Sequence, residues 1–200
     1  MGTESTTAEG LQKINVKISL EVPSDFDYDV LLAIFGRWRL EEGEEIIDLA
    51  DYLHVPEGPG CLLVSHLWQF GIDLGDGQPG LFYSSRMGLS GEAQERFTKV
   101  IRDCVEKSKR LLGESDIPQT IRPRWDEIEV IANDRVLAPN TDEVDELLRP
   151  GLTATLDRFY GTDGFTIERE KDPSLRLGYR VKAESADGLT FDEVLSRLGR

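Results

Sequence analysis

The sequence is poor in the residues from which metal and redox sites are usually built. Its 200 residues include only two cysteines and two histidines. Cys61 and Cys104 are far apart and form no Cys-x-x-Cys pair, which excludes the spacing of a zinc ribbon or a thioredoxin-type site. We therefore expect reduced thiols, and we predict neither a cofactor nor a metal site.

Positive charge is also scarce. Lys and Arg number 23 against 38 Asp and Glu, which gives a net charge of -15. Nucleic acids and anionic membranes are bound by clustered cations, so this balance argues against both as partners. Apolar runs fall well short of the about 20 residues of a membrane-spanning helix, and residues 1–10 lack the basic and apolar regions of a secretory signal. The sequence therefore predicts an acidic protein of the cytoplasm.

Two clusters rich in glycine and proline, at residues 56–60 and 75–80, divide the middle of the chain. Apolar runs between such clusters are typical of consecutive antiparallel strands. We predict a three-stranded meander in the middle of the sheet, with a short extra strand near 71–74. Its three strands are expected at about 45–54, 61–69 and 80–86.

Elsewhere, strand-like and helix-like periodicities alternate. Apolar and polar residues alternate as in strands at 14–22, 127–132, 164–170 and 176–183. Helices are predicted from Ser24 or Asp25, over about 91–112 with Ser90 as the cap, from Thr141 to Tyr160 with an interruption at Pro150, and from Thr190.

The element order divides the chain into two similar halves. We predict a disordered tail at 1–10, an N-terminal half at 11–113, a connector at 114–124 and a C-terminal half at 125–200, with the halves forming one compact unit. This order favours an α+β fold in which helices pack on one face of a largely antiparallel sheet. Two related, ferredoxin-like halves would produce the same order.

Both histidines lie in the predicted meander. A turn at residues 55–60 would place Asp51 and His66 on one face of the sheet as diagonal neighbours and His54 on the other face. In this register the two histidines cannot bind the same metal ion. An imidazole beside a carboxylate can act as an acid–base pair, so Asp51 and His66 are the candidate catalytic residues. The competing interpretation is that both histidines are structural.

Candidate binding residues lie on the same strands and in one loop. Trp68, Phe82 and Tyr83 either pack in the core or form a patch for a partner protein or a second copy of the chain, since Trp and Tyr are frequent interface anchors. Arg135 is a candidate anion contact, unless it pairs with the adjacent Asp134. His54 completes this set of candidate ligand- or partner-binding residues.

Recognisable catalytic motifs are missing from the sequence. Residues 56–60 do not form a phosphate loop, because their prolines lack N–H donors and a strand follows. No serine lies in a G-x-S-x-G elbow. Our first hypothesis is a non-enzymatic binding or protein-interaction protein, and a homodimer formed through an exposed sheet edge or an aromatic patch is one form of it. The alternatives are a small enzyme or metal-dependent protein using a His–Asp pair, and a small-molecule sensor.

Two runs resemble segments of uncharacterised bacterial proteins of about this length. They are DLADYLHVPEGPG at residues 48–60 and NDRVLAPNT at residues 133–141. The resemblance spans most of the chain and implies a bacterial, cytosolic origin. It implies no activity, cofactor or catalytic residue.

Overall fold

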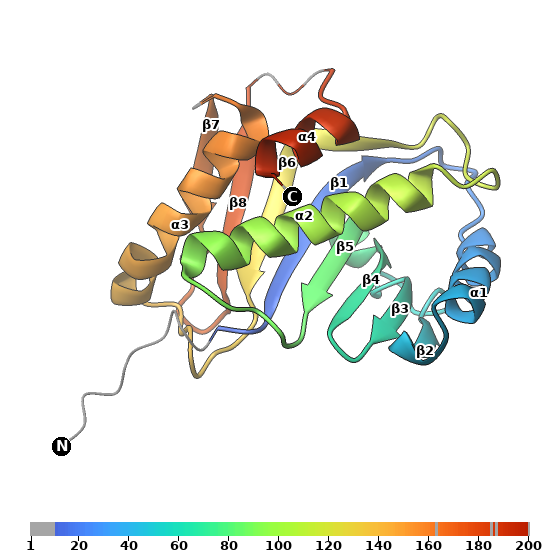
Figure 1. Cartoon of the computed structure of the whole chain (residues 1–200), viewed down its shortest axis with the longest axis horizontal. Helices are drawn as coiled ribbons and strands as arrows, with labels where there is room; N and C mark the ends of the chain where they lie inside the picture. Colours follow the sequence, from blue (N-terminus) through green and yellow to red (C-terminus); the bar gives the residue numbers. More distant parts are fainter. Residues whose placement is uncertain (1–10, 163, 185, 187, 200) are drawn as a thin grey trace.

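Eight strands form one antiparallel sheet, and four helices pack on one of its faces (Figure 1). The structure is a computed structural model that describes residues 11–162, 164–184, 186 and 188–199, so the predicted tail at 1–10 lies outside the described residues. The strands are β1 (Ile14–Glu21), β2 (Ile46–Asp51), β3 (Cys61–Ser65), β4 (Trp68–Asp73), β5 (Gly80–Ser85), β6 (Arg122–Ala132), β7 (Phe165–Arg169) and β8 (Leu177–Ala183). The helices are α1 (Val30–Glu42), α2 (Ala93–Leu112), α3 (Asp142–Tyr160) and α4 (Phe191–Leu198).

The two halves of the chain share this sheet and meet where β1 pairs with β6. The strand order is β2-β3-β4-β5-β1-β6-β8-β7, and each neighbouring pair is antiparallel. The predicted α+β class, the antiparallel sheet and the single helical face are confirmed. The prediction that the meander forms the middle was wrong, because β2 to β5 run inward from one edge of the sheet.

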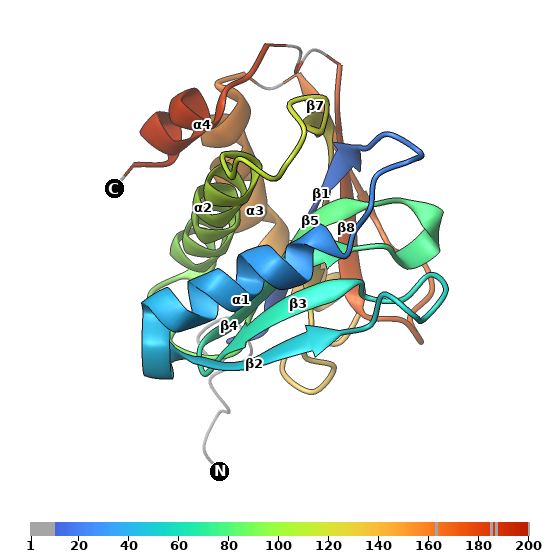
Figure 2. The same cartoon turned by 90° about the vertical axis from the view of Figure 1, so that its right-hand side faces the viewer.

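Alternation along β1 explains why the two faces of the sheet differ. Ile14, Val16 and Ile18 are fully buried on the helical side, whereas Asn15 and Lys17 point to the opposite side. Helix α2 packs on β1 and β5 and against α3 and α4. Figure 2 shows these helices on one side of the sheet, and the other side, which we call the open face, carries loops and the short 3-10 helix η2 (Gly75–Gly77) within the described chain. Each buried aliphatic side chain contributes about 1.5–3 kcal/mol, so the core lies on the helical side.

Helix α1 covers the other end of the sheet. It packs on β2 and β3, and its Phe35 and Trp38 lie against Phe70 of β4, with ring centroids 6.2 Å apart in both pairs. Trp38 donates its indole N–H to Glu114 at 2.7 Å, and the guanidinium of Arg110 lies 3.9 Å from its ring centroid. This aromatic cluster joins α1 to the end of α2.

The predicted strand at 61–69 is two strands, so the meander has four strands rather than three. β3 ends at Ser65 and β4 begins at Trp68. His66 and Leu67 make the turn, in which the Ser65 hydroxyl accepts a hydrogen bond from the Leu67 N–H at 3.1 Å. The turn contains neither glycine nor proline, which is why the sequence pattern did not reveal it.

Several predicted element boundaries also differ from the structure. α1 begins at Val30 rather than near Ser24, and the cap of α2 is Glu92, which forms a capping box with Glu95, rather than Ser90. β6 begins at Arg122, inside the segment predicted as a connector. The predicted caps Thr141 and Thr190 are confirmed.

Helix α3 continues through the predicted interruption at Pro150. A Cβ on the next residue, Gly151, would lie 2.7 Å from the backbone N of Gln94 in α2. The missing side chain therefore lets α2 and α3 approach closely, and their packing outweighs the local cost of the proline. Among the described residues, none of the helices has both the length and the apolar character needed to cross a membrane.

We expect opposite effects from adding a methyl group at two glycines. In Gly71→Ala the new Cβ would lie 2.0 Å from the Cys61 carbonyl oxygen, so β3 and β4 must separate and the free energy of unfolding should fall by at least about 2 kcal/mol. In Gly36→Ala nothing lies within 4 Å, and alanine favours the helix by up to about 1 kcal/mol. Urea denaturation of both variants tests this, and equal effects would contradict the close approach at Gly71.

Candidate functional site

The structure does not bring the candidate catalytic residues together. Asp51 pairs with Cys61 at the start of β3 rather than lying diagonally opposite His66, so the predicted register was wrong. His66 follows Ser65 at the other end of the five-residue strand β3, roughly 16 Å along the strand from the Asp51 pair. The reason is the turn between β2 and β3, which occupies residues 52–60 and is longer than expected. The His–Asp hypothesis therefore has no geometric support.

His54 lies exposed in that same long turn. His54 has no partner on a neighbouring strand, so its side chain belongs to neither face of the sheet. It also lies away from His66, which is in the turn at the other end of β3. Within the described part of the chain, no three His, Cys, Asp or Glu side chains gather as metal ligands would.

Two of the three candidate aromatic residues are buried rather than exposed at the surface. Trp68 and Tyr83 stack on the helical side with ring centroids 6.4 Å apart, and they are 6% and 3% exposed. The Tyr83 hydroxyl donates to Asp103 of α2 at 3.1 Å, and the Lys107 ammonium lies 3.5 Å from the Trp68 ring centroid. Phe82 lies on the opposite, open face. Binding of a partner protein or of a second copy of the chain stays a prediction, and these three side chains do not form an aromatic patch that would support it.

Arg135, by contrast, borders a hollow of about 560 Å³ on the open face. The volume falls in the range typical of small-molecule sites. Strands β6, β7 and β8 form the floor, and the loop after β6 and the hairpin between β7 and β8 form the walls. We call this hollow the arginine groove. It is lined by Glu129, Ile131, Arg135, Glu168, Arg169, Glu170, Lys171, Leu175, Arg176, Gly178, Tyr179 and Arg180.

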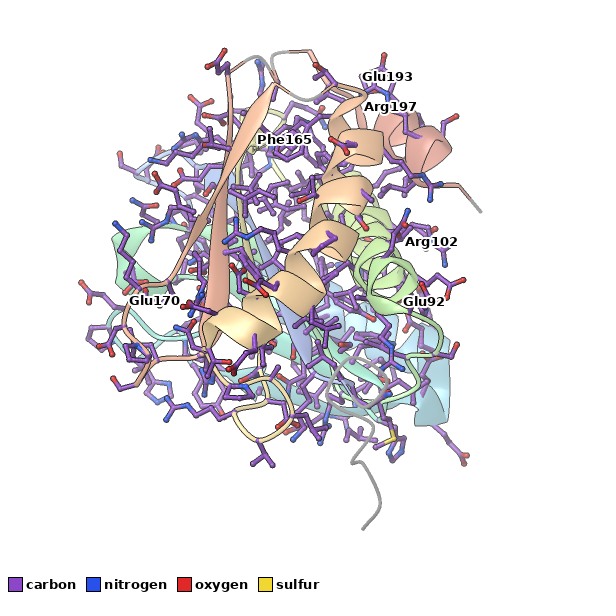
Figure 3. All side chains as sticks on the ribbon, turned by 90° about the vertical axis from the view of Figure 1, so that its left-hand side faces the viewer. Glu92, Arg102, Phe165, Glu170, Glu193 and Arg197 are labelled. Carbon is purple, nitrogen blue, oxygen red and sulfur yellow. The ribbon has the colours of Figure 1, made fainter. Side chains whose placement is uncertain are left out.

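Figure 3 looks onto β7 at the edge of the sheet beside the groove. Phe165 and Glu170 mark the two ends of the strand in this view. Helix α3 and helix α4, which carries the labelled Glu193 and Arg197, lie to one side. The arginine groove opens on the other side, away from the helices.

A row of alternating charges crosses the sheet at the inner end of the groove. Lys17 of β1 pairs in register with Glu129 of β6, Glu129 pairs with Arg180 of β8, and Arg180 pairs with Glu168 of β7. On the far side, the Lys17 ammonium contacts the Asp73 carboxylate at 2.5 Å. Opposite charges on neighbouring strands contribute about 0.2–1 kcal/mol per pair, so this charge row stabilises an otherwise uncovered face.

Glu129 is the unusual member of the charge row. Burial raises the pKa of its carboxyl above the ordinary value, and attraction to Lys17 and Arg180 offsets only part of that effect. Its carboxylate forms no hydrogen bond with the residues that the structure describes. A half-buried carboxyl group without a hydrogen-bond partner gains from any donor that a ligand supplies.

Gly178 creates the hollow beside the charge row. It pairs in register with Ile131 on the open face, where a larger side chain would fill the floor. A Cβ at this position would lie in ordinary van der Waals contact, 3.6 Å from Ile131 Cγ1 and 3.9 Å from Glu170 Cβ, so the glycine is not needed to relieve a clash. The floor beside Glu129 therefore carries no side chain at position 178 and is bordered by the apolar side chain of Ile131.

Sequence reasoning identified Arg135 and missed the other groove residues. The signal for Lys17, Glu129, Arg180 and Glu168 was present, because each is a charged residue on the polar side of a predicted strand. It could not be used, because the strand order that makes them neighbours joins segments more than 100 residues apart.

Comparison of the chain with protein-family models, with curated proteins and with solved structures found no match.

We expect Glu129 to make stability depend on pH. Because its pKa is raised in the folded state, the folded protein binds more protons than the unfolded chain between the ordinary and the raised pKa. The free energy of unfolding should therefore fall as the pH rises through that window, and Glu129→Gln should remove this part of the change. Urea unfolding between pH 4 and 8 measures it. Glu146→Gln, which removes one exposed carboxylate from α3 away from the charge row, is the control for the loss of a single acidic side chain.

Proposed function

We propose that this protein is a non-enzymatic binding protein and that the arginine groove holds an anionic ligand. The observation that carries the proposal is the set of cations at the outer end of the groove. Arg135, Lys171 and Arg176 form neither an ion pair nor a hydrogen bond with any residue in the described ranges. A guanidinium binds carboxylate or phosphate through two parallel hydrogen bonds, so two unpaired arginines beside one hollow suit such a ligand.

The charge balance of the whole chain supports this proposal. The chain carries 15 more acidic than basic side chains, so acidic partners are plentiful at its surface. Arg37, Arg110 and Arg124 each contact two carboxylates. Cations left without an ion pair or hydrogen bond around one hollow are a local excess of positive charge that an incoming anion would neutralise.

The composition of the lining favours binding over catalysis. Arg169 is already engaged with Asp142 at 2.6 Å and with the Asn140 side chain at 2.8 Å, so it braces the wall rather than offering a free charge. The other side chains that line the groove are mostly charged, and those of Ile131 and Leu175 are apolar. Recognition of shape and charge is the chemistry that these groups perform best.

Removing the two unpaired arginines should abolish anion binding. We expect the double variant Arg135→Ala/Arg176→Ala to bind glutarate at least tenfold more weakly than the wild type, because no other unpaired guanidinium lies at that end of the groove. Isothermal titration calorimetry measures the affinity. Arg39→Ala removes an exposed arginine from α1 and is the matched control. Equal affinities for the wild type and the double variant would contradict the proposal.

Filling the hollow should block binding without unfolding the protein. Gly178→Leu places a side chain on the floor beside Ile131, and its Cβ would make only ordinary van der Waals contacts, so the backbone can stay in place. We expect loss of glutarate binding with a fall in unfolding free energy of no more than about 3 kcal/mol. Gly178→Ala, which adds one methyl group, should retain binding. Unchanged binding by Gly178→Leu would place the anion elsewhere.

A further inference from the structure

We infer that the ligand of the arginine groove is a short peptide with a free amino group, which contacts Glu129, and a carboxylate at its other end, which contacts Arg135 and Arg176. This inference rests on the proposed function and names the class of ligand for the same groove. It follows from the unequal charges at the two ends and from the distance between them.

The inner end of the groove suits a cation better than an anion. Glu129 is half-buried on the floor, and the nearest opposite charges, Lys17 and Arg180, lie beside it on the neighbouring strands. Lys17 is already held by Asp73 and by the Gly75 carbonyl oxygen at 3.2 Å. A second anion placed here would face the Glu129 carboxylate, whereas an ammonium group would supply the hydrogen bonds that this carboxylate lacks.

The outer end of the groove suits an anion. Arg176 precedes β8, four residues before Arg180 on the same face, and Arg135 lies on the opposing wall. Their free guanidinium groups can hold one carboxylate between them. A ligand that is anionic at both ends can pair with the arginines of the outer end only. A zwitterion can pair with these arginines and also with Glu129 at the inner end.

The length of the groove selects a peptide over a single amino acid. Arg176 and Arg180 are four positions apart along the chain, which is roughly 13 Å of extended strand. The amino and carboxylate groups of one amino acid are too close to reach both ends. Three extended residues span about 10 Å, and the side chains at each end of the groove cover the remainder. The apolar floor at Ile131 and Gly178 lies beneath the middle of such a peptide.

The test compares two peptides that differ only at the amino terminus. We would titrate the wild-type protein with the tripeptide alanyl-alanyl-glutamate and with its N-acetylated form, which keeps every carboxylate and loses the ammonium. We expect the free peptide to bind at least tenfold more tightly. Glu129→Gln should reduce this preference to less than threefold, and Glu146→Gln, which removes an exposed carboxylate from α3 outside the groove, should preserve it. Free glutamate should bind more weakly than the free tripeptide.

The outcomes separate this inference from the proposed function. Equal or tighter binding of the acetylated peptide would overturn the inference, and so would binding of glutarate without binding of either peptide. In both cases the proposed function stands if Arg135→Ala/Arg176→Ala abolishes the binding. If neither the peptides nor glutarate bind, or if the double variant binds them like the wild type, the proposed function fails and the inference fails with it.

Discussion

The antiparallel pairing of β1 with β6 is the constraint on which the rest of the structure depends. It joins the two halves of the chain into one sheet, and it brings Val16 against Val130 and Ile18 against Ile128 beneath α2. The same register fixes the other face, because side chains alternate along both strands. Lys17 can therefore lie beside Glu129 only while its two neighbours in β1 are buried in the core.

This coupling of the two faces explains where a binding site can form. The helical face is covered by buried apolar side chains over most of the sheet, so its main contribution is stability. The open face has no α-helix over it within the described chain, and its strands present charges instead. Where Gly178 omits a side chain, the charge row ends beside a floor bordered by Ile131, and the loop that carries Arg135 and the hairpin that carries Arg176 enclose it. The core thus positions the groove without contributing atoms to it.

Much of the fold was predictable from the sequence, and most of the site was not. Local patterns revealed β1, α2, β8 and the capped helix at Thr190, because each is encoded within about twenty neighbouring residues. The turn at His66 lacked turn residues, and the pairing of Asp51 depended on the length of a loop, so both were misjudged. The groove depends on strand order, which no local pattern specifies. Arg135 was found because its loop is polar, and not because its partners were recognised.

The position of β1 also has a consequence for folding during synthesis. Ile14 pairs with Ala132, so one edge of β1 stays without its partner until more than 100 further residues have been made. At synthesis rates of about 5–20 residues per second this takes several seconds or longer, and such non-local pairing also slows folding itself. An unpaired strand edge promotes aggregation, and lysine is a residue that natural sheets use to discourage it. Lys17 places such a residue in β1, the strand that has to wait longest for its second neighbour.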